Sequence, residues 1–191
     1  MLAYLQGLSL GLAYVAPIGV QNLFVINAGL SQPRAAAYRT ALIVIFFDVT
    51  LALAGFFGIG ALIEHSELIR KGVLLAGSLV VMYMGLRLML SREVAGPAIN
   101  VNIPLMKTIG MACVVTWFNP QAIIDVSLLL GSFRVALPPE ESGLFLWGVV
   151  CASCLWFLSL TTISSLFKNR FTPRLLRIIN LVCGLVIFFY G

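Results

Sequence analysis

The chain has 191 residues, of which 61% are hydrophobic and only 10% are charged, and its mean hydropathy is +1.05. A soluble domain carries about 25% charged residues, so this composition excludes a soluble protein and indicates an integral membrane protein. The net charge of +5 comes from basic residues in short connections between apolar runs. That placement is typical of a protein oriented in a lipid bilayer, and it argues against a nucleic-acid partner.

Six segments are long and apolar enough to span a bilayer, which takes about 20 residues. They cover approximately residues 2–30, 36–63, 69–90, 104–131, 143–166 and 173–190. A polar stretch divides the chain into two halves, about 1–92 and 103–191, with three spans each. Similar halves with an odd number of spans must insert in opposite orientations. The sequence therefore predicts an all-α fold, a single transmembrane domain of six helices arranged as two inverted three-helix repeats.

The first span is interrupted at its middle by the sequence PIGVQN, residues 17–22. The bilayer core offers backbone groups no water, so such a break is tolerated only against protein or a water-filled cavity. Gly19 has no side chain and would let a ligand approach the backbone. The break indicates a substrate site, although Pro17 could also produce a simple kink. The candidate substrate-binding residues here are Pro17, Gly19, Gln21 and Asn22.

The second and fourth spans each carry an aspartate near the middle, Asp48 and Asp125. An ionisable side chain at membrane depth costs roughly 2.5–3.5 kcal/mol even on lenient insertion scales, and no lysine or arginine lies clearly deep enough to neutralise either one. We expect the two aspartates to face each other, a cavity or a cationic ligand, and to share an exchangeable proton. They are candidates for both proton coupling and substrate binding. The alternative is that each is a protonated carboxyl that hydrogen-bonds to a neighbouring helix.

The fourth span is broken at its middle as well, by the sequence WFNPQ at residues 117–121, shortly before Asp125. Pro120 suits the first position of a new helix and Asn119 suits its N-cap. The free N–H groups and the positive end of the helix dipole at that position would bind a carboxylate. Asn119, Pro120 and Gln121 are therefore candidate ligands. A zwitterion with an additional positive charge would fit between these helix ends and the aspartates.

The fifth span contributes one further candidate ligand, Trp156, whose alternative role is packing between helices. No nucleophilic triad, phosphate-binding loop or cofactor motif occurs in the sequence, so we expect neither an enzyme nor a bound cofactor. The cysteines lie in apolar segments and the only histidine, His65, lies in a loop, so we expect them to form no metal site. The pair Gly7 and Gly11 forms a GxxxG motif, which indicates close helix packing and leaves room for a homodimer.

Basic residues are divided unequally between the two sides of the predicted membrane. Cytoplasmic loops are enriched in lysine and arginine, so the side with more of them is predicted to be cytoplasmic and both termini to lie outside. The richer side carries Arg34, Arg39, Arg87, Arg92, Lys107, Lys168, Arg170, Arg174 and Arg177, and the other side carries Arg70, Lys71 and Arg134.

Several motifs together resemble those of the LysE (lysine/arginine exporter) family, in order and over nearly the whole chain. They are PIGVQN at 17–22, Asp48 after an apolar run, TWFNPQ at 116–121 with Asp125 following, LWF at 155–157 and RIIN at 177–180. The resemblance implies a six-span exporter of amino acids in the bacterial cytoplasmic membrane, driven by the proton gradient. Asp125 stands where the basic-amino-acid branch carries an acidic residue, which implies lysine or arginine as substrate.

Two other substrates stay open. One alternative is a neutral amino acid of the homoserine or threonine type. The other is a divalent metal ion, for which four side chains offer oxygen ligands that hard cations accept: Asp48, Asp125, Asn22 and Asn119.

Overall fold

The computed structural model describes residues 1–17, 19–58 and 103–167, together with a few single helical residues, Lys71, Leu75, Leu79, Met82, Leu86, Leu181 and Leu185. Every regular element in this part of the chain is a helix, which confirms the all-α class. In chain order the elements are α1 (Leu2–Val15), α2 (Val20–Ser31), α3 (Arg34–Phe56), α6 (Leu105–Trp117), α7 (Pro120–Ala136), the 3₁₀ helix η1 (Pro139–Glu141) and α8 (Ser142–Phe167).

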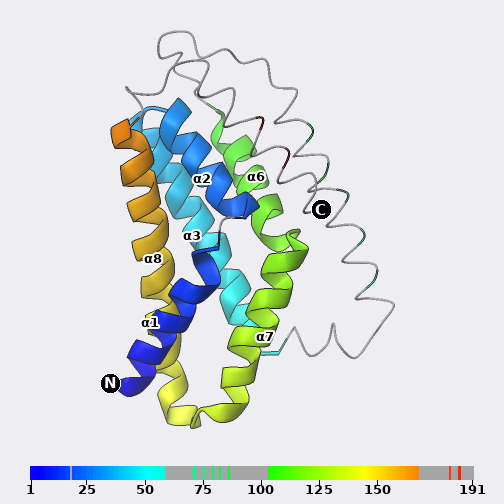
Figure 1. The fold of residues 1–191 in the computed structure, drawn as a ribbon, viewed down its shortest axis with the longest axis vertical. Helices are drawn as coiled ribbons and strands as arrows, with labels where there is room; N and C mark the ends of the chain where they lie inside the picture. The colour runs from blue at the N-terminus through cyan, green and yellow to red at the C-terminus, as the bar shows by residue number, and fades with distance from the viewer. Residues whose placement is uncertain are drawn as a thin grey trace.

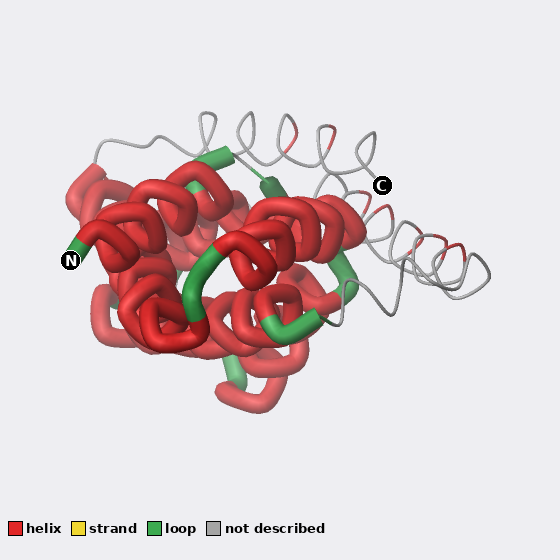
Figure 2. Tube along the Cα trace, turned by 90° about the horizontal axis from the view of Figure 1, so that it is seen from below, coloured by secondary structure: helices red, strands yellow, loops and turns green. Residues whose placement is uncertain are grey.

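The helices form an elongated bundle (Figure 1). Helices α1 and α2 follow one another along its long axis, as do α6 and α7, while α3 and α8 each run most of its length (Figure 1). Figure 2 shows the same bundle nearly end-on. Helix α1 packs chiefly on α8, and α3 contacts α2, α6, α7 and α8. The side chains of α3 therefore reach most of the interior of the bundle.

Both interruptions predicted from the sequence are present. Helix α1 ends at Val15 and α2 begins at Val20, and the two are bent relative to each other by 79°. Helix α6 ends at Trp117 and α7 begins at Pro120. Two helical segments, Arg34–Phe56 and Pro139–Phe167, are each long and apolar enough to cross a membrane, and the bent pair α1 and α2 would be a third span if it crosses as one.

The predicted third and sixth spans, 69–90 and 173–190, lie almost entirely outside the described residues. The inverted repeat of two three-helix halves, about 1–92 and 103–191, therefore stays a prediction.

Local chemistry explains where the broken helices begin and end. Proline has no N–H and cannot continue the hydrogen bonds of a helix that precedes it, and the hydrogen bonds of α1 run up to Ala16, the residue before Pro17, which donates to the Leu12 carbonyl. Gly19 is the N-cap of α2, with an extended backbone at φ −116° and ψ −170°. Pro120 is the first residue of α7, which is the position that proline favours in a helix.

Small residues bring α1 and α8 into close contact. A Cβ atom added at Gly7 would overlap the backbone carbonyl of Phe145, and one added at Gly148 would overlap the backbone of Tyr4. Gly11 similarly faces Val149 and Ala152. The GxxxG pair is thus used for helix packing within the chain. The homodimer, for which this motif left room, gains no support from it.

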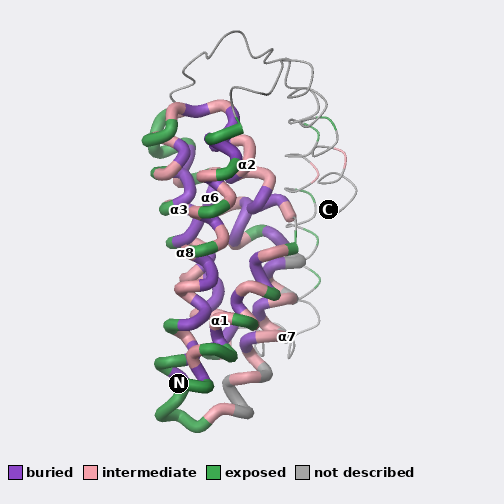
Figure 3. Tube along the Cα trace, turned by 60° about the vertical axis from the view of Figure 1, so that its left-hand side comes forward, coloured by how far each residue is buried: buried purple, intermediate pink, exposed green. Residues whose placement is uncertain are grey.

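The outer surface of the bundle fits a lipid environment. Large apolar side chains such as Leu42, Phe46, Trp147 and Leu155 are exposed, whereas the faces that the helices turn toward each other are buried (Figure 3). Exposed charged side chains such as Arg34, Lys107 and Glu140 lie near the ends of helices, where water and lipid headgroups would meet them. These features agree with a protein embedded in a membrane.

Candidate functional site

Asp48 lies at the centre of the bundle and is completely buried. Its Oδ1 atom accepts hydrogen bonds from the Tyr14 hydroxyl at 3.0 Å and from Gln21 Nε2 at 3.2 Å. Its Oδ2 atom accepts a hydrogen bond from the Ser153 hydroxyl at 2.5 Å. The three donors come from α1, α2 and α8 and all are neutral, so the hydrogen bonds found for this carboxylate join four helices without bringing a cation to it.

Two opposing effects act on the charge of Asp48. Removing a carboxylate from water strongly penalises its charged form, whereas three hydrogen-bond donors aimed at its oxygens stabilise that form. Tyrosine and serine hydroxyls can each donate or accept a hydrogen bond. The surroundings of Asp48 can therefore accommodate both the charged and the neutral carboxyl.

Apolar side chains close the space along the bundle on either side of Asp48. Toward the C-terminal end of α3, Phe56 stacks on Phe145 with ring centroids 5.7 Å apart, and Phe133 stacks on the same ring at 5.3 Å. Toward the other end of α3, Val44 and Phe157 are fully buried. The carboxylate consequently lies in an occluded position in this conformation.

Gln21 connects the first break to the second. It lies in the first turn of α2, and its Nε2 atom donates both to Asp48 and, at 3.1 Å, to the hydroxyl of Thr116 in the last turn of α6. An amide nitrogen has two hydrogens, and these two contacts use both of them. One side chain thus ties the start of α2 and the end of α6 to the same carboxylate.

Asn22 holds the backbone of the first break. Its Nδ2 atom donates to the carbonyl of Val15 at 3.0 Å and to the carbonyl of Pro17 at 2.6 Å. Its Oδ1 atom accepts the indole N–H of Trp156 at 2.9 Å. The last carbonyls of a helix have no hydrogen-bond partners within the helix. Asn22 supplies a partner for the last carbonyl of α1, that of Val15. Two predicted ligands, Asn22 and Trp156, are therefore paired with each other in this conformation.

The start of α2 is more open than its surroundings. A Cβ atom added at Gly19 would meet no atom within 4 Å, and Pro17 is exposed. No side chain caps the first turn of α2, although the first N–H groups of a helix need partners from outside it. Open space therefore adjoins the N-cap residue Gly19 at the positive end of the α2 dipole, whereas Val20, Gln21 and Asn22, which follow it, are buried.

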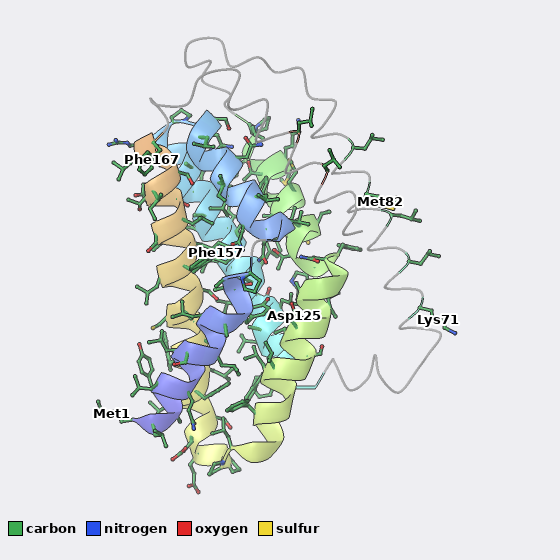
Figure 4. The ribbon with its side chains drawn as sticks, viewed as in Figure 1. Met1, Lys71, Met82, Asp125, Phe157 and Phe167 are labelled. Carbon is green, nitrogen blue, oxygen red and sulfur yellow. The ribbon has the colours of Figure 1, made fainter. Side chains whose placement is uncertain are left out.

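The second break places Asn119 just before α7 and Asp125 within α7. Asn119 is buried, and its backbone carbonyl accepts the N–H of Ile123 at 3.1 Å. Asp125 is partly exposed, and its carboxylate is close enough to the Tyr14 hydroxyl to interact with it electrostatically. Figure 4 shows Asp125 on α7, beside the end of α1 that carries Tyr14. The side chains of Pro120 and Gln121 lie outside the described part of the chain.

Sequence reasoning did not find Tyr14, Ser153 or Thr116. Hydroxyl side chains are common in membrane helices, where they usually bond within the helix or to a neighbour, so none of the three is conspicuous in the sequence. A partial signal exists for Ser153, which precedes Trp156 by three residues and so lies on the same side of α8. Spacing alone could not show that its hydroxyl points at Asp48.

Comparisons with known proteins agree on one family. The model of the family described as LysE type translocator matches residues 12–191. The chain is 34% identical to the arginine exporter protein ArgO of Shigella flexneri, and also 34% identical to that of Escherichia coli (strain K12), over 97% of this chain and 90% of each relative. It is 31% identical to the arginine exporter protein ArgO of Pectobacterium atrosepticum, over 96% of this chain and 91% of the relative. No solved structure matches the chain.

The role of Asn22 in holding the first break can be tested by stability. The substitution Asn22→Ala removes three hydrogen bonds, and at roughly 1 kcal/mol for each bond we expect it to lower the free energy of unfolding by about 3 kcal/mol. Unfolding by SDS in lipid bicelles measures this. Asn27→Ala, a substitution in the same helix at a partly exposed site, is the matched control. Equal stability of the two variants would contradict the role given to Asn22.

Proposed function

Because this chain belongs to the LysE type translocator family, we propose that it exports a cationic amino acid from the bacterial cytoplasm in exchange for protons, with arginine as the main substrate. Membership of the family makes the chain a membrane transporter and not an enzyme. The observation that carries the proposal is a fully buried carboxylate, Asp48, held by three neutral donors beside two broken helices.

The start of α2 provides a place for the carboxylate of the substrate. The backbone N–H groups that follow Gly19 have no side-chain cap, and Gly19 itself adjoins open space. A helix N-terminus of this kind favours an anionic group. The start of α7, at Asn119, Pro120 and Gln121, is the corresponding position in the second half of the chain and completes the proposed carboxylate site.

Asp125 provides the counter-charge for the cationic groups of the substrate. It is partly exposed, whereas Asp48 is fully buried and its surroundings leave no room for a ligand. We therefore divide the two roles that the sequence assigned jointly: Asp125 contacts the guanidinium or ammonium group, and Asp48 carries the exchangeable proton. Tyr14 interacts with both carboxylates, so the charge on one affects the site at the other.

Transport then follows from competition between charges. A charged Asp48 strengthens the hold on a cation at Asp125, and a protonated Asp48 weakens it, because unlike charges attract more strongly in a low-dielectric interior than in water. The two inverted halves of the chain would move about the site between them to expose it to one side of the membrane at a time. Protons returning down their gradient would thereby release the amino acid outside.

The two rival substrates have less support from the described side chains. A divalent cation would need Asn22 as an oxygen ligand, but the Asn22 side-chain oxygen accepts the indole N–H of Trp156. Within the described residues, no group of three or more His, Cys, Asp or Glu side chains is placed to hold a metal ion. A neutral amino acid would offer Asp125 its α-ammonium group but no positively charged side chain.

Counterflow in proteoliposomes tests the substrate and the role of Asp125. Vesicles loaded with unlabelled arginine should take up labelled arginine, and lysine should compete while threonine and manganese do not. We expect Asp125→Asn to abolish this uptake, because the substitution removes the counter-charge for the cation. Ser127→Ala, a substitution two residues further along α7, is the control.

Unchanged arginine uptake by Asp125→Asn would contradict the cation site. Competition by threonine in place of lysine would favour a neutral substrate, and competition by manganese would favour a metal ion.

We also propose that both termini lie outside the cytoplasm of the bacterial cell, with the chain crossing the inner membrane several times. The exposed basic side chains Arg34, Arg39 and Lys107 lie near the starts of α3 and α6. The N-terminus and the connection that carries Glu140 and Glu141 lie at the opposite end of the bundle (Figure 1). Basic residues favour the cytoplasmic side, so the basic end faces inward.

Labelling of intact cells tests this orientation. In a chain whose native cysteines are replaced, we expect Glu140→Cys to react with a membrane-impermeant maleimide and Lys107→Cys to react only after the cells are lysed. Both positions are exposed, so they form a matched pair. The reverse pattern would place the termini in the cytoplasm.

A further inference from the structure

The two oxygens of the Asp48 carboxylate have unequal surroundings. Oδ1 accepts hydrogen bonds from Tyr14 and from Gln21, while Oδ2 accepts its hydrogen bond from Ser153. The Gln21 amide nitrogen can only donate a hydrogen bond, whereas the Ser153 hydroxyl can donate or accept one. A proton on Oδ1 could be donated to the Tyr14 hydroxyl, but Gln21 would then donate to a protonated oxygen, which is a weaker acceptor than a carboxylate oxygen, and the tyrosine hydrogen would need another acceptor. A proton on Oδ2 requires only that one hydroxyl turn.

We propose that the neutral form of Asp48 carries its proton on Oδ2 and that Ser153 is the positioning residue through which this proton is exchanged. The inference rests on the proposed function, in which Asp48 is the proton site. In the charged form Ser153 donates to Oδ2. In the neutral form Oδ2 donates to Ser153, and the serine hydrogen turns to another acceptor.

Helix α8 offers an acceptor for the serine hydrogen once it has turned. Serine and threonine in membrane helices commonly donate to the backbone carbonyl four residues earlier, which for Ser153 belongs to Val149. Two other hydroxyls of α8 already do this: Thr161 donates to the carbonyl of Phe157 at 2.8 Å, and Thr162 donates to the carbonyl of Leu158 at 2.7 Å. The serine can therefore leave the carboxylate without its own hydrogen losing a partner.

The proton transfer needs one reactant from outside, a protonated water admitted to the site. That water gives its proton to Ser153 Oγ, and the hydrogen that Ser153 had been donating passes to Asp48 Oδ2. One O–H bond breaks at the water and one at the serine, one forms at the serine and one at the carboxyl, and each electron pair stays on its oxygen. The serine is neutral before and after, and the carboxylate has been neutralised.

Other ionisable groups around Asp48 influence when this transfer occurs. Tyr14 from α1 contacts the carboxylate directly, and Cys154 from α8 interacts with it electrostatically. Asp125 from α7 acts through its interaction with Tyr14. The contact found from α2 is the neutral side chain of Gln21, whose amide also donates to Thr116 of α6. Arginine bound at Asp125 would therefore change the proton affinity of Asp48 through Tyr14, while the proton itself moves through Ser153.

Reconstituted protein with a pH-sensitive dye inside the vesicles separates proton flux from substrate exchange. For Ser153→Ala we expect arginine-driven proton flux to fall by about tenfold or more, the effect of losing a hydrogen bond to a charged group. Exchange of labelled for unlabelled arginine at equal pH should persist, because exchange moves no net proton across the membrane. Ser153→Thr, which keeps the hydroxyl, should restore the proton flux.

Ser159→Ala is the matched control, since Ser159 is exposed on the same helix. Wild-type ratios of protons to arginine in Ser153→Ala would overturn the inference and leave the proposed function intact. Loss of proton flux in Tyr14→Phe but not in Ser153→Ala would overturn it as well, by placing the proton on Oδ1. Arginine exchange without any proton flux in the wild-type protein would instead overturn the proton coupling, and with it the role of Ser153.

A folding defect in Ser153→Ala is recognised by loss of both activities together. In that case the variant Ser153→Cys tests the role of the hydroxyl, because a thiol is a weaker hydrogen-bond donor than a hydroxyl. We expect it to retain exchange with a reduced proton flux. An undiminished proton flux in Ser153→Cys would overturn the inference.

Discussion

A carboxylate without a cationic partner in the described residues is the constraint on which the arrangement of this bundle depends. Asp48 is completely removed from solvent, and a charge so placed is stable only if hydrogen-bond donors replace the water it has lost. Those donors come from three different helices. One side chain consequently connects α1, α2 and α8 to α3, and a change in its charge would change its hydrogen bonds to the other three helices. A transporter needs such a connection between the state of its site and the packing of its helices.

The broken helices also follow from the need to give polar groups inside the bundle hydrogen-bond partners. A continuous helix would satisfy its own backbone and offer nothing to a ligand, whereas a break at membrane depth exposes backbone groups that need partners. Asn22 supplies partners for the end of α1, and Trp156 in turn pairs with Asn22. The start of α2, by contrast, has no side-chain cap. The first break thus has one side held by protein, and the proposed function places the substrate carboxylate at the other side.

Much of this site could be predicted from the sequence, because its main features break local rules. An aspartate within an apolar run and a proline within a span are conspicuous, and Asp48, Pro17 and Pro120 were found for that reason. The donors to Asp48 were not found, since Tyr14 and Ser153 are ordinary residues of membrane helices whose role depends on packing between distant segments. Packing also determines which helix Gly7 and Gly11 contact, namely α8 of the same chain. It likewise brings together Asn22 and Trp156, which the sequence predicted as two separate ligands.

The central claim is that Asp48 changes its protonation when the substrate binds. Infrared difference spectroscopy on the protein in lipid, with and without arginine, measures this directly through the C=O stretch of a protonated carboxyl. The account predicts that arginine removes such a band from the wild-type protein and that Asp48→Asn lacks this change. A spectrum in which arginine binds without altering any carboxyl band, or in which the change persists in Asp48→Asn, would contradict it.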